Sequence, residues 1–421
     1  MGNDKSPMKA VMLVLAVAIA ANALVLMASN AKSAGDGDGP YYIGIARNLA
    51  NGTGYVLTDS FWPDKPTMGR APVWPFILSV PARLAPHADD YTLLRGTAAC
   101  LNAASALLLF GIAWMLSRDR RIATVAGVAY ALYPVALALT AGGFSEIPYV
   151  FVVALGILMI LRGEKWLVPG VIVLGLGPLV RSNFIILPVM AGLVALPRFR
   201  SPEFRSIRAW GMFAMLAAAF WLPSALWMAR NYALSGEFPV LSTIEGETLY
   251  GANNTYVASD LSVWGYWVFP NDIPGETAKK DLARTMTERQ LDRYYHRKGV
   301  AFLKQHWFEL PRLELGKLIR GFVPVPWVAG WGSYAVFFFR AILYAGILLS
   351  FRSFRILDER YRTMVSGMLL VVLLTVLIYY GTYRFTFCVE VFLIPAVAIA
   401  AFAARAGQLS GQESASARSR L

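Results

Sequence analysis

Long runs of apolar residues limit, more than any other feature, how this chain can fold. Of its 421 residues, 57% are hydrophobic and only 15% are charged, and its mean hydropathy is +0.50. A soluble globule of this length could not bury so much apolar surface. The first run, residues 10–28, holds about twenty apolar residues and can cross roughly 30 Å of hydrocarbon. We therefore expect a membrane protein that keeps its first helix, with cleavage after the small-residue stretch SNAKSA as the alternative.

Ten apolar runs predict about ten membrane helices. They span residues 10–28, 92–116, 122–140, 146–161, 166–180, 184–196, 209–229, 331–350, 363–380 and 388–404. Short arginine-rich loops separate alternate pairs of runs, at residues 118–121, 162–165, 198–208 and 351–362. Because positively charged loops stay on the cytoplasmic side, we place these four loops and both chain termini in the cytoplasm. The sequence thus predicts an all-α, multi-pass integral membrane protein.

The net charge of +13 comes largely from these short loops. We attribute it to membrane orientation and to contact with anionic lipids, and we expect no nucleic-acid partner. The two cysteines, Cys100 and Cys388, lie inside apolar runs, which argues against a disulfide framework. The three histidines are widely spaced, so we expect no histidine zinc site.

Under this topology two longer segments remain on the outer side of the membrane. The chain then divides into an N-terminal transmembrane region (1–229) that contains the first outer loop (30–91), a second outer segment (230–330), C-terminal transmembrane helices (331–404) and a small polar tail (405–421). We expect the tail to be disordered, because it lacks the apolar residues needed to pack.

Both outer segments contain helical patterns. In the first loop, residues 39–50 (GPYYIGIARNLA) are expected to form an amphipathic helix. Residues 70–85 are interrupted by three prolines, so we expect them to lie at the membrane interface without crossing it. In the second segment, residues 277–307 are polar and helical in pattern.

Five groups of motifs occur in a set order along most of the chain. They are DGPYYIGIARNLANGTGY followed by RAPVWPFIL in the first outer loop, YP and SEIPY within 133–149, GLGPLVRSNFIILP at 175–188, LPSALWMARNYALSGEFPVLSTIEGETLYGANN at 222–254, and YRFTFCVEVFLIPAVAIAA near the end. In this order and spacing they resemble the polyprenyl-phosphate-sugar-dependent glycosyltransferases of the GT-C superfamily, in the branch of glycosyltransferase family 39. That branch includes protein O-mannosyltransferases and the aminoarabinose transferases of lipid A.

The resemblance implies a GT-C-like helix bundle in a bacterial cytoplasmic membrane, with its active site on the outer face. The donor would be a sugar linked to a polyprenyl phosphate, and the acceptor would be a lipid, a glycan or a protein. An acidic residue in the first outer loop would act as general base. Asp38 matches that residue best, because it stands four residues before Tyr42 in a DxxxYxxIA pattern, and Asp36 completes a D-x-D.

Sugar transfer from a phosphate needs two kinds of group. A base must take the proton of the acceptor hydroxyl while cations stabilise the charge on the departing phosphate. Arginine suits the second task, because its planar fork holds phosphate oxygens and keeps its charge. The candidates at outer helix ends are Arg70, Arg181, Arg230 and Arg384.

One or two arginines can neutralise a monophosphate, so we expect no cofactor. A divalent metal at Asp36 and Asp38 is the less favoured alternative. Direct displacement of the phosphate predicts inversion at the anomeric carbon.

Further candidates for binding the sugar or the acceptor are polar residues near helix ends, namely Tyr42, Asp36, Glu146, Asn231, Tyr250, Asn253 and Asn254. Most candidates also have a structural interpretation. Asp38 fits a helix N-cap, and Glu146 fits an acid that favours the helix dipole. Arg181 and Arg384 fit cations that extend to the interface. The pair Arg230 and Asn231 fits a helix C-terminal cap, and the stretch Gly-Ala-Asn-Asn fits an ordinary turn.

Two other function classes stay open. A transporter or flippase for lipid-linked sugars would need paired ionisable residues and broken helices near the middle of the bilayer. Most charged residues here lie at helix ends, although Arg340 falls inside the predicted 331–350 helix. An O-antigen polymerase or ligase would use a diphosphate-linked donor, so competition between monophosphate and diphosphate donors would distinguish it. The sequence specifies neither the sugar nor the acceptor.

Overall fold

The computed structural model describes residues 7–29, 38–58, 61–63, 65–182, 207–237, 241–324, 331–350 and 357–418. This part of the chain consists of helices and loops, and its β-structure is one isolated bridge between Val56 and Pro66. The predicted all-α class is therefore confirmed.

The helices of the first half begin with a long apolar one. They are α1 (Pro7–Ala28), α2 (Gly39–Ala50), α3 (Val73–Leu84), α4 (Asp90–Ser117), α5 (Arg120–Ala131), α6 (Pro134–Ala141), α7 (Glu146–Leu161), the 3-10 turn η2 (Glu164–Trp166) and α8 (Leu167–Leu174). The helix predicted over residues 39–50 is α2, with the same bounds. α3 continues through its internal Pro81 and buries Trp74 completely.

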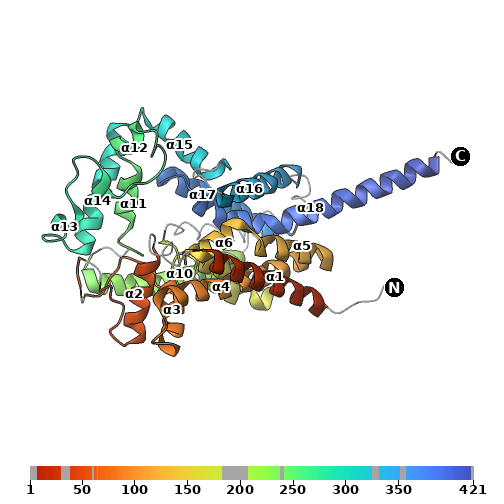
Figure 1. Ribbon diagram of the computed structural model, residues 1–421, viewed down its shortest axis with the longest axis horizontal. Helices are drawn as coiled ribbons and strands as arrows, with labels where there is room; N and C mark the ends of the chain where they lie inside the picture. Colours follow the sequence, from red (N-terminus) through yellow and green to blue (C-terminus); the bar gives the residue numbers. More distant parts are fainter. Residues whose placement is uncertain are drawn as a thin grey trace.

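The helices of the second half include both long apolar and polar ones. They are α10 (Ile207–Ser235), α11 (Glu245–Ala252), α12 (Thr255–Ser259), the 3-10 turn η5 (Pro270–Asp272), α13 (Lys279–Leu282), α14 (Glu288–Gln305), α15 (Leu310–Phe322), α16 (Trp331–Ser350), α17 (Glu359–Ile378) and α18 (Tyr383–Arg418). A capping box of Thr287 and Gln290 starts α14. The backbone of α18 stays helical through residues 405–418, most of the tail expected to be disordered, and the helix extends past its neighbours toward the C-terminus (Figure 1).

Among the described residues, five helices are long and apolar enough to cross a membrane: Met8–Ala28, Asp90–Ser117, Trp210–Ser235, Glu359–Ile378 and Tyr383–Ala403. A sixth span arises if α5 and α6, which meet at a bend of 44°, are counted as one. Pro134 accounts for this break, because proline lacks the N–H that would continue the hydrogen bonding of α5. These helices agree with a multi-pass membrane protein.

The predicted count of about ten membrane helices is not confirmed. α7 and residues Ser333–Leu349 of α16 are apolar but shorter than a full span. The predicted run 166–180 contains only the short helix α8, followed by turns. The run 184–196 lies outside the described residues.

One large hydrophobic core joins the membrane helices, and two small cores lie in the 230–330 segment. In the large core α4, α5, α7 and α18 pack together with α1. The small cores place α11 against α14 through Tyr250 and Tyr295, and α14 against α15 through Phe302 and Leu313. Helices α11 to α14 gather at the end of the molecule that lies away from both chain termini (Figure 1).

Arg340, which had no place in the sequence-based scheme, belongs to a buried hydrogen-bonded network between α16 and α18. Its Nη2 lies 2.8 Å from Glu390 Oε1, and both side chains are 2% exposed. Nη2 also donates to Thr386 Oγ1 at 3.1 Å. The hydroxyls of Tyr133 and Tyr344 donate to the Glu390 carboxylate. We call these five residues the Arg340–Glu390 network.

Candidate active site

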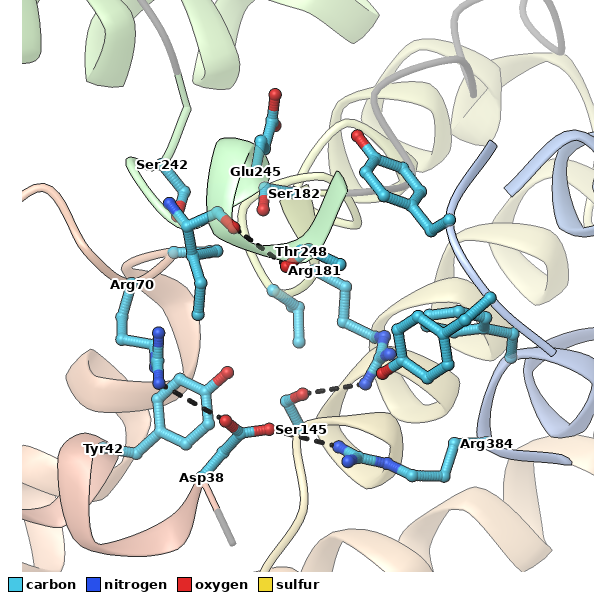
Figure 2. A pocket seen from close by; sticks show the side chains of 16 residues that line it. Asp38, Tyr42, Arg70, Ser145, Arg181, Ser182, Ser242, Glu245, Thr248 and Arg384 are labelled. Atoms are coloured by element: carbon cyan, nitrogen blue, oxygen red, sulfur yellow. Dashed lines mark hydrogen bonds and ion pairs between the residues drawn. The ribbon is translucent and has the colours of Figure 1, made fainter. Parts of the chain in front are cut away.

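A polar cavity of about 110 Å³ lies where segments distant in the sequence meet. Its walls come from the start of α2, the loop before α3, the turn before α7, residues 180–182, the start of α11, the link after α17 and the first turn of α18. Five residues predicted for the site line it together: Asp38, Tyr42, Arg70, Arg181 and Arg384 (Figure 2).

Asp38 stands between two arginines. It occupies the N-cap position of α2, yet its side chain makes no capping hydrogen bond. Instead, Oδ1 lies 3.4 Å from Arg70 Nη2, and Oδ2 lies 3.2 Å from Arg384 Nη2 (Figure 2). Burial alone would raise the pKa of Asp38, but the charges of Arg70 and Arg384 outweigh it and lower that pKa. Asp38 is therefore ionised at neutral pH.

Glu146 lies behind the cavity wall and is completely buried. Its Oε1 lies 2.6 Å from both Arg181 Nη1 and Arg384 Nε. Arg181 also donates to Ser145 Oγ at 3.0 Å. A buried carboxylate thus holds two arginines in place, and this role goes beyond a simple helix-terminus acid.

We call Arg70, Arg181, Arg384, Asp38 and Glu146 the arginine cluster. Three guanidinium groups face two carboxylates, which leaves one positive charge in excess. Among the described residues, the buried Nε of Arg70 also has no hydrogen-bond partner. Excess positive charge and an unused donor beside a cavity suit an anion such as a phosphate.

The loop that carries Arg70 is fixed by Glu288, in the first turn of α14. The Glu288 carboxylate accepts hydrogen bonds from Thr67 Oγ1 at 3.0 Å, from Met68 N at 3.1 Å and from Thr243 Oγ1 at 2.7 Å. A Cβ on Gly69 would lie 2.7 Å from Glu288 Oε1, so only glycine fits there without a shift. Through this latch (Glu288, Thr67, Met68 and Thr243) the 230–330 segment positions the first loop.

Arg230 and Asn231 do not line the cavity. Arg230 Nη1 donates to Thr67 O at 2.7 Å and to Asn231 Oδ1 at 2.9 Å. The Arg230 guanidinium lies 4.6 Å from the ring centre of Trp227. These contacts support the loop before Arg70. Arg230 was predicted to bind phosphate, but in this arrangement it does not reach the cavity.

Tyr250, Asn253 and Asn254 also lie outside the cavity lining. Tyr250 donates to Glu276 Oε2 at 2.6 Å, Asn253 donates to Ile378 O at 3.0 Å, and Asn254 caps α12. The physical reason is that α11 begins at Glu245 and presents its first turns to the cavity, whereas these residues come at and beyond its C-terminal end. Their contacts are structural in this arrangement.

Sequence reasoning missed several cavity residues, chiefly Ser145, Ser182, Ser242, Glu245, Thr248 and Tyr380. For Glu245 a signal existed. Residues two apart on a helix point to nearly opposite sides, so Glu245 reaches the cavity while Glu247 pairs with Lys279 Nζ at 2.5 Å. A helix predicted to begin at Glu245 would have placed Glu245 and Glu247 on different faces, so only one of them could be expected to line the cavity.

A metal ion needs several ligating side chains gathered in one place. Within the described ranges, no group of three or more histidine, cysteine, aspartate or glutamate side chains could hold a metal ion. Asp36, the predicted partner of Asp38, lies outside those ranges.

No protein-family model matches the sequence, and no curated protein sequence matches it. In structure, the chain is similar to ArnT from Cupriavidus metallidurans, in a crystal structure bound to undecaprenyl phosphate. The sequence identity is 15% and the TM-score 0.42, and the alignment covers 93% of this chain and 76% of that one.

Proposed function

We propose that this protein is an inverting membrane glycosyltransferase. It moves a sugar from a polyprenyl-phosphate donor to a hydroxyl of a lipid, glycan or protein acceptor, at the outer face of a bacterial cytoplasmic membrane. The observation that carries the proposal is the position of the Asp38 carboxylate between Arg70 and Arg384 in a polar cavity. A base and a set of phosphate-binding cations are thereby within reach of one substrate.

The reaction follows from these charges. Oxygens of the donor phosphate bind Arg70, Arg181 and Arg384, and the lipid tail stays in the membrane. Asp38 takes the proton of the acceptor hydroxyl as its oxygen attacks the anomeric carbon. The bond from that carbon to the phosphate oxygen breaks, and the arginines stabilise the charge left on the phosphate. A single displacement inverts the configuration of the anomeric carbon.

The low pKa of Asp38 in the free protein would make it a weak base. Donor binding corrects this, because the phosphate competes for Arg70 and Arg384 and adds negative charge beside the carboxylate. Both effects raise the proton affinity of Asp38. The base becomes effective only when the donor is in place.

The Arg340–Glu390 network is the kind of ionisable pair that a transporter would need in its membrane region. Its acceptor oxygens, however, are taken by Arg340, Tyr133 and Tyr344, and neither Arg340 nor Glu390 lines the cavity. The network fits a structural tie between helices, so the transferase remains the better-supported function.

The experiment is Asp38→Asn in purified protein, assayed for sugar release from polyprenyl-monophosphate-linked donors. Turnover should fall about a hundredfold or more, because asparagine is not a base. Asp89→Asn is the matched control, since Asp89 caps α4 and lies outside the cavity lining. Unchanged turnover in Asp38→Asn would remove Asp38 from the mechanism. Preference for a diphosphate-linked donor would favour a polymerase or ligase instead.

A further inference from the structure

The cavity contains a second carboxylate with different surroundings. Glu245, in the first turn of α11, lines the cavity on the side opposite Asp38, and its carboxyl group points away from Asp38 (Figure 2). Within the part of the chain that the structure describes, its carboxylate makes no hydrogen bond and no ion pair, whereas Asp38 contacts two arginines. A half-buried acid without a partner in a polar cavity is available to a ligand.

The neighbours of Glu245 explain why it has no cationic partner. The charge of Arg289, on α14, lowers the pKa of Glu245. The Nη1 of Arg289, however, donates a hydrogen bond to Asp292 Oδ2 at 2.6 Å. Asp292 Oδ1 in turn accepts from Gly246 N at 2.7 Å. Glu245 also affects Tyr379, whose pKa is raised by burial, then by the charge of Glu245 and then by that of Asp292. An acid, an engaged arginine and a phenol thus surround Glu245.

Burial and these neighbours determine the pKa of Glu245. Burial and then the charge of Asp292 raise the pKa of Glu245 to about 7, while the charge of Arg289 lowers it. Asp38 differs, because its arginines lower its pKa. The two carboxylates of one cavity therefore respond differently to pH near neutrality.

The cavity is divided by charge. The donor phosphate belongs at the arginine cluster and would be repelled by an ionised Glu245. A carboxylate accepts hydrogen bonds through two oxygens, and neighbouring hydroxyls of a sugar can donate to both. The end of the cavity at Glu245 thus suits a neutral molecule rich in hydroxyl groups.

We propose that Glu245 marks the acceptor subsite, where its ionised carboxylate accepts hydrogen bonds from two neighbouring hydroxyls of a sugar-bearing acceptor. This assignment rests on the proposed transferase function. Because the hydroxyls bind the ionised form, acceptor affinity falls as pH drops below about 7, the pKa of Glu245. Donor affinity depends on this group much less, because the phosphate binds at the arginine cluster.

A labelling experiment tests the subsite without turnover. The full-length protein in lipid nanodiscs is treated near neutral pH with dicyclohexylcarbodiimide, which modifies protonated carboxyl groups, and the modified residue is located by mass spectrometry. We expect Glu245 to be labelled and Asp38 not. Methyl glycosides should slow labelling of Glu245, and fully O-methylated glycosides or undecaprenyl phosphate should not. Equal labelling with and without methyl glycosides, or protection by undecaprenyl phosphate, would overturn the assignment.

A kinetic test uses Glu245→Gln, with Glu245→Asp as a variant that keeps the acid. In transfer to the same methyl glycosides, the glutamine variant should raise the acceptor KM roughly tenfold above pH 7, with a much smaller change in the donor KM. Its acceptor KM should also lose the pH dependence that the wild type and Glu245→Asp show. Glu247→Gln is the matched control, because Glu247 pairs with Lys279 and does not line the cavity. A pH-dependent acceptor KM in Glu245→Gln would contradict the proposal.

The two proposals can fail separately. If glycosides protect Glu245 but polyprenyl-phosphate sugars are neither bound nor consumed, the transferase proposal fails and a glycan-binding site remains. If donors are consumed but no glycoside protects Glu245, the subsite assignment fails and the transferase remains.

Discussion

The Arg340–Glu390 network and the arginine cluster use the same residue types with opposite results. In the network one arginine faces one carboxylate, and two tyrosines and a threonine complete the hydrogen bonds. In the arginine cluster three cations face two carboxylates, and the side chain of Asp38 is 33% exposed. The first is neutral and closed, whereas the second keeps excess charge and access to a cavity.

The comparison separates two uses of buried charge. A pair whose hydrogen bonds are complete has no free donor or acceptor for a ligand. It therefore affects protein stability and the relative position of the two helices. A cluster with excess positive charge and an unused hydrogen-bond donor can bind an anion, because both interact favourably with it. Substitutions in the arginine cluster should therefore change turnover, and substitutions in the Arg340–Glu390 network should change the free energy of unfolding.

The largest effect is expected for Arg384→Lys in the arginine cluster. Lysine keeps the charge but cannot bridge Asp38 and Glu146, so turnover with a polyprenyl-phosphate sugar should fall roughly a hundredfold or more. The thermal midpoint should change little, because Arg181 still neutralises Glu146. Rates and thermal unfolding of the purified variant are the measurements. Turnover close to that of the wild type would place Arg384 outside the chemistry.

A smaller effect, on stability, is expected for Arg340→Met in the closed network. Removing one partner leaves Glu390 as an uncompensated buried charge, which costs about 3 kcal/mol of unfolding free energy. The double variant Arg340→Met with Glu390→Leu should recover much of that loss. Thermal unfolding in a defined detergent measures both. If the folded double variant turned over more slowly than the wild type, the network would also serve the chemistry.

The smallest effect is expected for Glu288→Gln, which weakens the latch. Three donors point at the carboxylate, and an amide can accept with only one oxygen, so the loop before Arg70 loosens. The donor KM should rise roughly fivefold while kcat changes little. Glu276→Gln is the control, because Glu276 binds Lys298 and Tyr250 within the 230–330 segment. A donor KM raised equally by both variants would show a general loss of structure and no specific role for the latch.

Much of the fold and part of the site could be predicted because they depend on local patterns. The apolar runs identified the long membrane helices, and the spacing of apolar residues along one helix face in 39–50 predicted α2. Of the arginines chosen at helix ends, Arg70 and Arg384 lie in segments that meet at the cavity, and their role in binding phosphate stays a prediction. Arg230 does not line this cavity, because its guanidinium donates to the backbone oxygen of Thr67.

Composition and periodicity by themselves determined that this chain is an all-helical membrane protein with an acid at the start of α2, since burial of apolar runs and helix periodicity are local properties. Only the tertiary structure decided which charges meet. It paired Arg340 with Glu390, held Arg384 between Asp38 and Glu146, and placed Glu245 in the lining of the cavity. Coulombic energy depends on distances of a few ångströms between residues far apart in sequence, and packing alone sets those distances.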